Sequence, residues 1–202
     1  MTIRNINNIN LVGAKKIKNS KVNLYTLDNF MNNDTCDKLI DLIRQNNQRS
    51  TITTENTEQD KHFRTSKSSF FNDNLDFIKK INNKICMYLG MEFGRTESMQ
   101  GQFYEVGNEF KYHTDYFDVN NRYESTEHIG SRGQRTWTFM IYLNNVEKGG
   151  ETRFKNLDLA IYPKKGMALI WTNTNDRGEG NYDTLHCGAP VIKGEKFIIT
   201  KW

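Results

Sequence analysis

The stretch "RTWTFMIYL", residues 135–143, has the alternation of a β-strand whose two faces differ. Successive side chains of a strand point to opposite sides of its sheet. One face is purely apolar and suits packing against helices: Phe139, Ile141 and Leu143. The other face carries polar or polarisable ends: Thr138, Met140 and Tyr142. This second face is suited to line a cavity, as the inner face of a jelly-roll barrel does.

Similar short runs, rich in aromatic and β-branched residues, fill the chain from about residue 96 onwards. Turns that contain Gly, Asn or Asp divide them, which is typical of strands in a largely antiparallel sheet. The runs are "ESMQGQFYEVG" (97–107), "EFKYHTDYF" (109–117), "MALIWTN" (167–173) and "EKFIITKW" (195–202). Earlier in the chain, 21–30 and 64–71 can also form strands.

Two amphipathic helices are predicted ahead of these strands. The first, within 32–47, has apolar residues at helical spacing, namely Cys36, Leu39, Ile40 and Ile43, with Asn33 or Asp34 as its N-cap. The second, within 74–90, has the apolar stripe Leu75, Ile78, Ile81, Ile85 and Leu89. Gly90 follows it in the place where a left-handed residue commonly ends a helix.

Helices followed by a run of strands predict an α+β fold. We expect a double-stranded β-helix (jelly-roll) core with the N-terminal helices packed on its major sheet. The chain should form a single domain over residues 1–202. Within it we expect an N-terminal extension (1–23), a supporting region of helices and strands (24–95) and the jelly-roll core (96–202).

The composition is that of a globular protein, with 202 residues of which 36% are hydrophobic and 12% aromatic. A net charge of +4, from 28 basic and 24 acidic residues, does not demand a nucleic-acid partner. Three scattered cysteines, Cys36, Cys86 and Cys187, argue against a disulfide scaffold and a structural zinc site. No apolar run suits a signal peptide or a membrane span. We therefore expect a soluble, cytoplasmic protein without a nucleic-acid or membrane partner, and the sequence leaves its oligomeric state open.

The triplet His113-Thr114-Asp115 places an imidazole and a carboxylate on one side of a strand. Two histidines and one carboxylate form the facial triad that holds Fe(II) and leaves positions open for a cosubstrate and O₂. His186, at the entry to the last strands, is the natural third ligand. The other two histidines, His62 and His128, lie in polar segments and are interpreted as solvated loop residues.

Lys196 follows His186 by ten residues and shares a face of the last strand with Ile198, Thr200 and Trp202. A lysine on the cavity face of a core strand is costly unless its ammonium meets an anion. A dicarboxylate cosubstrate, with one end on the metal and the other at the lysine, would meet that need.

The ordered set of H-x-D, a later His and a Lys ten residues beyond it resembles the Fe(II)/2-oxoglutarate dioxygenases, and specifically the collagen-type prolyl 4-hydroxylases. Four further segments are similar to that family in the same order: 29–40 ("NFMNNDTCDKLI"), 64–71 ("RTSKSSFF"), 135–154 and 186–202. The resemblance covers residues 24–202.

The resemblance implies that His113, Asp115 and His186 bind iron and that Lys196 binds the distal carboxylate of 2-oxoglutarate. Further cosubstrate contacts carried over from the family are Tyr104, Thr138 and Trp202. The implied activity is hydroxylation of proline in a peptide or protein substrate, with Fe(II), 2-oxoglutarate, O₂ and ascorbate.

One position departs from the family pattern. Phe110 stands three residues before His113, where the family usually has tyrosine near the substrate proline. A lysyl residue or methylated nucleic acid as the substrate therefore stays an alternative, as does a jelly-roll binding module without catalysis.

The loops 53–61 and 118–134 are placed to close over an extended peptide, with Arg122 and Arg132 as candidates to contact its carbonyls. Cys187 should point away from His186 as a small buried hydrophobe.

Overall fold

The computed structural model describes residues 11–50, 62–121, 124–130 and 133–202. An eight-stranded antiparallel sheet forms its centre, in the order β1-β2-β11-β7-β14-β5-β4-β3. The strands are β1 (Lys15–Lys16), β2 (Leu24–Leu27), β3 (Gln48–Arg49), β4 (Lys67–Phe70), β5 (Gln100–Tyr104), β7 (Trp137–Tyr142), β11 (Ala168–Thr172) and β14 (Lys196–Lys201). β1 lies within residues 1–23, for which we expected an N-terminal extension, and it pairs with β2 at the edge of the sheet.

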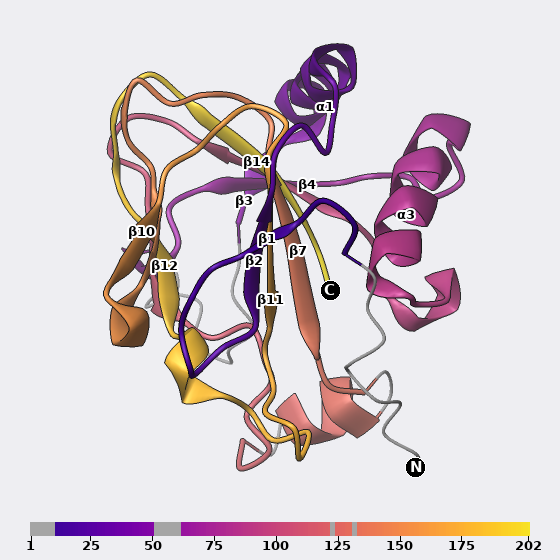
Figure 1. Cartoon of the computed structure of the whole chain (residues 1–202). Helices are drawn as coiled ribbons and strands as arrows, with labels where there is room; N and C mark the ends of the chain where they lie inside the picture. The colour runs from indigo at the N-terminus through magenta and orange to yellow at the C-terminus, as the bar shows by residue number, and fades with distance from the viewer. Residues whose placement is uncertain (1–10, 51–61, 122–123, 131–132) are drawn as a thin grey trace.

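A second antiparallel sheet has four strands in the order β10-β9-β12-β6. They are β6 (Phe110–His113), β9 (Thr152–Phe154), β10 (Leu159–Ile161) and β12 (His186–Gly188), while β8 (Lys148–Gly149) and β13 (Val191–Lys193) form a separate pair. Figure 1 shows β10 and β12 on one side of the large sheet and the two α-helices on the other. The expected α+β fold with a jelly-roll core is thereby confirmed.

The helices are α1 (Asn33–Asn46) and α3 (Asp76–Leu89). The predicted N-cap of α1 was wrong by one or two residues, because the side chain of Asn32 accepts the hydrogen bond from the backbone N–H of Thr35. Leu75 does not join the buried stripe of α3. It precedes the first helical residue and is 47% exposed. Gly90 ends α3 with a φ of 60°, the left-handed conformation predicted for it.

Short helical turns connect several of these elements. They are η2 (Phe93–Arg95), η3 (Glu124–Ile129), η4 (Lys155–Leu157) and η5 (Tyr182–Thr184). The turn η3, a π-helix, lies in the segment 118–134 that we expected to be a loop. The other predicted loop, 53–61, lies outside the described residues, as do Arg122 and Arg132. No helix in the described ranges combines the length and the apolar character needed to cross a bilayer.

The two faces of β7 pack into different apolar clusters, as its alternation predicts. Phe139, Ile141 and Leu143 lie in the cluster between the large sheet and the helices. Met140 and Tyr142 lie in the cluster between the two sheets. Met140 of the second cluster also lines the cavity described below. One face of β7 thus packs toward the helices, and the other faces the cavity.

Helix α1 approaches the sheet closely at Gly101 on β5. A Cβ atom at this position would lie 2.6 Å from Cγ1 of Ile43 and 2.9 Å from Cζ of Phe71. Only glycine fits here without movement of the helix or the strand, so Gly101 sets the distance between α1 and the sheet.

Candidate metal centre

His113 and His186 face each other on neighbouring strands of the small sheet. They are direct partners in the register of β6 and β12, and their ring centres are 4.3 Å apart. Asp115 lies just beyond β6, with its Oδ1 3.6 Å from Nε2 of His113 and 3.9 Å from Nε2 of His186. Each residue offers one ligand atom, and these atoms all lie within 4.8 Å of one another. The structure therefore brings together the three residues that the sequence predicted as ligands.

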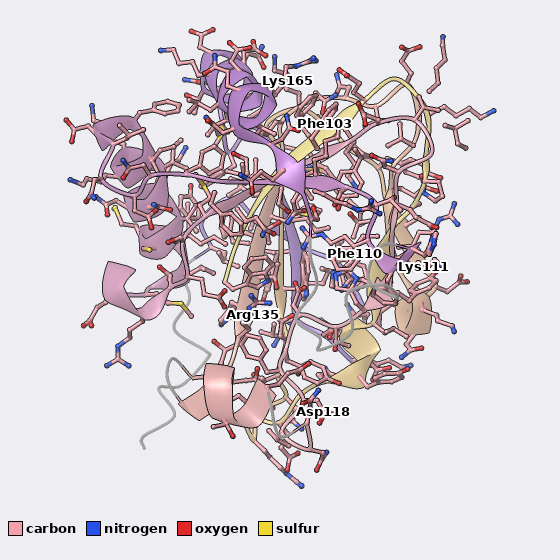
Figure 2. The ribbon with its side chains drawn as sticks, turned by 180° about the vertical axis from the view of Figure 1, so that it is seen from behind. Phe103, Phe110, Lys111, Asp118, Arg135 and Lys165 are labelled. Atoms are coloured by element: carbon pink, nitrogen blue, oxygen red, sulfur yellow. The ribbon has the colours of Figure 1, made fainter. Side chains whose placement is uncertain are left out.

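The backbone orients both imidazoles toward a common point. Nδ1 of His113 lies 2.8 Å from the carbonyl oxygen of Lys111, and Nδ1 of His186 lies 2.9 Å from that of Thr184. A carbonyl oxygen only accepts, so Nδ1 carries the proton and donates in each ring. Nε2 then keeps its lone pair on the side of Asp115, which is how histidine ligands of metals are commonly held. Figure 2 labels Phe110 and Lys111 on β6, the strand that ends at His113.

The protonation states also suit a metal. Burial lowers the pKa of His186 to about 4, so this ring is neutral at neutral pH. Burial alone would raise the pKa of Asp115, but His186, His113 and the Thr138 hydroxyl together lower it well below its ordinary range. A neutral imidazole and an ionised carboxylate are the forms that bind a cation. Two imidazoles and one carboxylate also match the donor set of a non-haem Fe(II) site, so these residues fit that ion.

Lys196 lies at the other end of the same cavity. Its side chain is 1% exposed and has no ion pair or hydrogen bond with any residue that the structure describes. Its Nζ lies 5.0 Å from the ring centre of Tyr104 and 5.8 Å from that of Tyr142. Burial lowers the pKa of Lys196 to about 8. A buried ammonium of this kind is a receptor for an anionic group.

The cavity that contains the three candidate ligands and Lys196 lies between the two sheets. Its walls are formed by Arg64, Gln102, Tyr104, Phe110, His113, Asp115, Met140, Thr152, Trp171, His186, Gly188, Lys196, Ile198, Thr200 and Trp202. Lys196, Ile198, Thr200 and Trp202 all line it, as the alternation of the last strand predicts. Trp202 also packs on the guanidinium of Arg135, which lies 4.1 Å from the centre of its ring.

Thr138 lies at the metal end of this region rather than beside Lys196. Its Oγ1 donates a hydrogen bond of 2.6 Å to Oδ2 of Asp115. The register explains this position, because the residue of β7 that pairs with Ile198, near Lys196, is Tyr142. Tyr142 donates to Oγ1 of Thr152 at 2.7 Å, and burial raises its pKa, so it remains a neutral hydrogen-bonding group. The alternation of β7 predicted that Tyr142 lies on the cavity face, but the neighbouring residues in the sequence indicated no role for it.

One wall of the cavity carries a stack of side chains that the sequence indicated only in part. The ring of Phe110 lies nearly parallel to that of His113, with an angle of 14° and 3.5 Å between centres. The guanidinium of Arg64 lies 4.7 Å from the centre of the Phe110 ring, and its Nη2 donates to Oε1 of Gln100 at 3.0 Å. Arg64 was visible in the sequence only as the start of a family-like segment, because its position depends on packing between distant strands.

The remaining predicted residues lie outside the cavity. Cys187 is buried and pairs with Arg153 in the register of β12 and β9, so it points away from His186 as expected. His62 is exposed. The side chain of His128 is outside the described residues.

Comparisons with known proteins point in the same direction as the geometry. Residues 99–202 match the model of the 2OG-Fe(II) oxygenase superfamily. The chain is 37% identical over 142 residues to prolyl 4-hydroxylase subunit alpha-2 of Gallus gallus, a match that covers 69% of this chain and 26% of the subunit. It is 32% identical to prolyl 4-hydroxylase 2 of Arabidopsis thaliana, covering 95% of this chain and 71% of the relative.

The solved structures give a similar result. The viral collagen prolyl hydroxylase vCPH of Paramecium Bursaria Chlorella virus-1, in its 2OG complex, has a TM-score of 0.69 and 28% sequence identity. The likeness covers 89% of this chain and 94% of the viral chain. This chain spans about a quarter of the length of the animal alpha subunits that it matches.

Proposed function

Since the chain belongs to the 2OG-Fe(II) oxygenase superfamily, we propose that it hydroxylates proline residues in a peptide or protein substrate, with 2-oxoglutarate and O₂ as cosubstrates. The observation that carries this proposal is the pairing of two sites in one cavity. Three ligand atoms converge at one end, and at the other lies a buried ammonium that forms no ion pair with the residues the structure describes.

The roles that we propose follow from these positions. His113, Asp115 and His186 would hold Fe(II), and Lys196 would hold the distal carboxylate of 2-oxoglutarate. When bound, the iron and the 2-oxo acid supply the oxidising chemistry that activates O₂ and places one oxygen atom on a carbon of the substrate. The protein binds and orients these groups and keeps bulk water from them.

Lys196 would contribute electrostatics and position. Its ammonium gains little from water because the side chain is buried, so a carboxylate that reaches it forms a strong, charge-assisted bond. Tyr104 and Tyr142 present aromatic rings around this ammonium and leave it facing the cavity. Thr138 would serve the metal end, where it contacts Asp115, and Trp202 would close the cavity wall.

The substrate would bind at the wall formed by Phe110 and Arg64. The apolar ring of Phe110 suits contact with a pyrrolidine ring, which has no polar group on its side chain. The relatives named prolyl 4-hydroxylase support proline over the other target groups. Phe110 lacks a hydroxyl, so the site would hold proline by shape and apolar contact.

The test is to incubate the protein with Fe(II), 2-oxoglutarate and proline-rich peptides and to measure succinate and peptide mass. We expect succinate formation that depends on the peptide, and a gain of one oxygen atom located on proline. The Asp115→Ala variant is the control and should give neither product. Oxygen gained by lysine peptides, or formaldehyde released from methylated nucleic acid, with proline peptides unmodified, would contradict the substrate assignment. Absence of succinate with all three would favour a binding module.

Several expectations stay predictions. Ascorbate is expected to sustain turnover, and the sequence favours a soluble cytoplasmic protein. We also propose that residues 1–202 fold as one domain in which 24–95 support the core of 96–202.

A further inference from the structure

Three buried polar residues form a chain of hydrogen bonds that ends on a metal ligand. Asn173 follows β11, Thr138 lies on β7 and Asp115 lies beyond β6. Nδ2 of Asn173 donates to Oγ1 of Thr138 at 2.8 Å, and Oγ1 of Thr138 donates to Oδ2 of Asp115 at 2.6 Å. Asn173 and Thr138 are completely buried, and Asp115 is 7% exposed. Water therefore does not compete for these bonds.

The direction of this chain follows from its chemistry. A threonine hydroxyl has a single hydrogen, and an amide nitrogen can only donate. Because Oγ1 of Thr138 accepts from Asn173, its own hydrogen is available for Asp115. If the amide of Asn173 were reversed, two acceptor oxygens would compete for that hydrogen. The amide orientation shown is therefore the one that satisfies the carboxylate.

The position of Asn173 is fixed by its backbone, whose N–H donates to the carbonyl oxygen of Thr136 at 2.8 Å. Its side-chain Oδ1 is buried without a hydrogen-bond partner in the described part of the chain. An unpaired buried acceptor costs folding free energy.

This chain of hydrogen bonds gives the two carboxylate oxygens of Asp115 different partners. Oδ2 is engaged by Thr138, whereas Oδ1 faces Nε2 of His113 and Nε2 of His186. The terminal torsion of an aspartate is otherwise soft. A carboxylate that turned both oxygens to the metal would occupy one of the positions that a facial triad leaves open.

We propose that Asn173, acting through the Thr138 hydroxyl, is a positioning residue that makes Asp115 a one-oxygen ligand and keeps a coordination position open for the 2-oxo acid. This inference rests on the proposed function and deepens it. It assigns a role to Asn173, whose side chain donates to Thr138 and acts on Asp115 only through that hydroxyl.

The test measures two dissociation constants in anaerobic solution, for Co(II) and then for 2-oxoglutarate on the Co(II)-loaded protein. We expect Thr138→Val, which keeps the shape and removes the hydroxyl, to weaken binding about 10- to 100-fold, as loss of an outer partner of a ligand does. Thr138→Ser keeps the hydroxyl and should stay within about 3-fold of wild type by the same comparison.

Asn173→Ala should weaken binding in the same direction as Thr138→Val. Because Asn173 acts through Thr138, the double variant should bind about as weakly as Thr138→Val alone, a non-additive result. Asn82→Ala is the matched control, since Asn82 is also completely buried, donates to a carboxylate (Asp73) and leaves its Oδ1 unpaired. Asn82→Ala should lower stability without changing either dissociation constant.

Two outcomes would overturn the inference. One is that Asn173→Ala lowers stability like Asn82→Ala and leaves both dissociation constants unchanged. The other is that the effects of Asn173→Ala and Thr138→Val add. If the wild-type protein itself binds neither Co(II) nor 2-oxoglutarate, the proposed function fails, and this result is distinct from the first two.

Discussion

Lys196 and Tyr104 are direct partners on neighbouring strands, and the ammonium of Lys196 lies 5.0 Å from the centre of the Tyr104 ring. The aromatic ring stabilises the cation but does not neutralise it. No carboxylate within the described ranges lies within 4 Å of this Nζ. The free protein thus keeps an unneutralised charge inside its core, which is unfavourable for folding and favourable for binding an anion.

Replacement of Lys196 should weaken 2-oxoglutarate binding and spare the metal. A hydrogen bond to a charged group contributes about 1.5–3 kcal/mol, so Lys196→Met should raise the dissociation constant roughly 10- to 150-fold. Lys201→Met is the control, because Lys201 is equally buried on the same strand but donates to the carbonyl oxygen of Glu97. Calorimetric titration of 2-oxoglutarate into each metal-loaded variant measures its dissociation constant. Equal effects from the two variants would contradict the role of Lys196.

The affinity for 2-oxoglutarate should also depend on pH. Burial lowers the pKa of Lys196 to about 8, so the free protein loses this charge as pH rises through that value. Under the proposed role of Lys196, the dicarboxylate binds only when the ammonium is charged, so its affinity should be constant below about pH 7 and fall by up to tenfold per pH unit above about pH 8. The nearby Tyr104 and Tyr142 have raised pKa values, so they stay neutral over this window.

Titrations of 2-oxoglutarate from about pH 6 to about pH 9.5 would check this dependence. The Lys196→Met variant should show a flat profile. A profile that falls equally in the variant would mean that another group is responsible, with Glu151 and Cys187 the neighbours whose charges act on Lys196.

The 2-oxoglutarate affinity should fall as pH rises, whereas the contribution of Lys196 to the stability of the free protein should increase. The unfolded chain binds more protons than the folded one between the pKa of about 8 and the ordinary value of 10.5. The contribution of Lys196 to the free energy of unfolding should therefore rise with pH in this window. Urea denaturation at several pH values, taken as the difference between wild type and Lys196→Met, measures it.

The stack of Phe110 on His113 should contribute to metal binding. An aromatic pair is worth about 0.5–1.5 kcal/mol beyond its buried area, so Phe110→Leu should weaken Co(II) binding roughly 2- to 10-fold. Phe110→Tyr keeps the ring and should bind Co(II) as the wild type does. If Phe110→Leu also binds like the wild type, the stack does not hold His113 in place.

The closeness of α1 to the sheet gives a prediction about the fold. Gly101→Ala would place a Cβ 2.6 Å from Ile43, and overpacking of this kind costs about 1–3 kcal/mol of unfolding free energy. Gly94→Ala is the control, since no atom lies within 4 Å of a Cβ built there. Urea denaturation of both variants would show the difference. A Gly101→Ala protein as stable as the wild type would mean that the helix moves without cost.

The sequence predicted those features that depend on local periodicity. The alternation in 138–143 placed Phe139 with the helices and Tyr142 at the cavity, because side-chain direction in a strand needs no knowledge of its partners. The stripes of α1 and α3 were likewise correct apart from Leu75 at the helix start.

The sequence did not reveal features that depend on register between distant strands. Thr138 lies on the predicted face, but the pairing of Tyr142 with Ile198 decides that Tyr142, and not Thr138, lies near Lys196. Asn173 gave no signal, since its bond to Thr138 joins the end of β11 to the neighbouring strand β7, and these two strands are far apart in the sequence. The three proposed metal ligands were singled out because their residue types and order are distinctive, and the structure brings them together. Their distances in space could not be deduced from their spacing in the sequence.

The most direct test of the site is an anaerobic titration of 2-oxoglutarate into the Fe(II)-loaded protein, followed by visible absorption. We predict the charge-transfer band of a 2-oxo acid chelated to Fe(II) in the wild type, half-maximal at a higher 2-oxoglutarate concentration in Lys196→Met. The double variant Asp115→Ala/His186→Ala should give no band at the same Fe(II) concentration. A wild-type protein without the band, or a double variant with the same band, would contradict the assignment of this cavity as an iron and 2-oxoglutarate site.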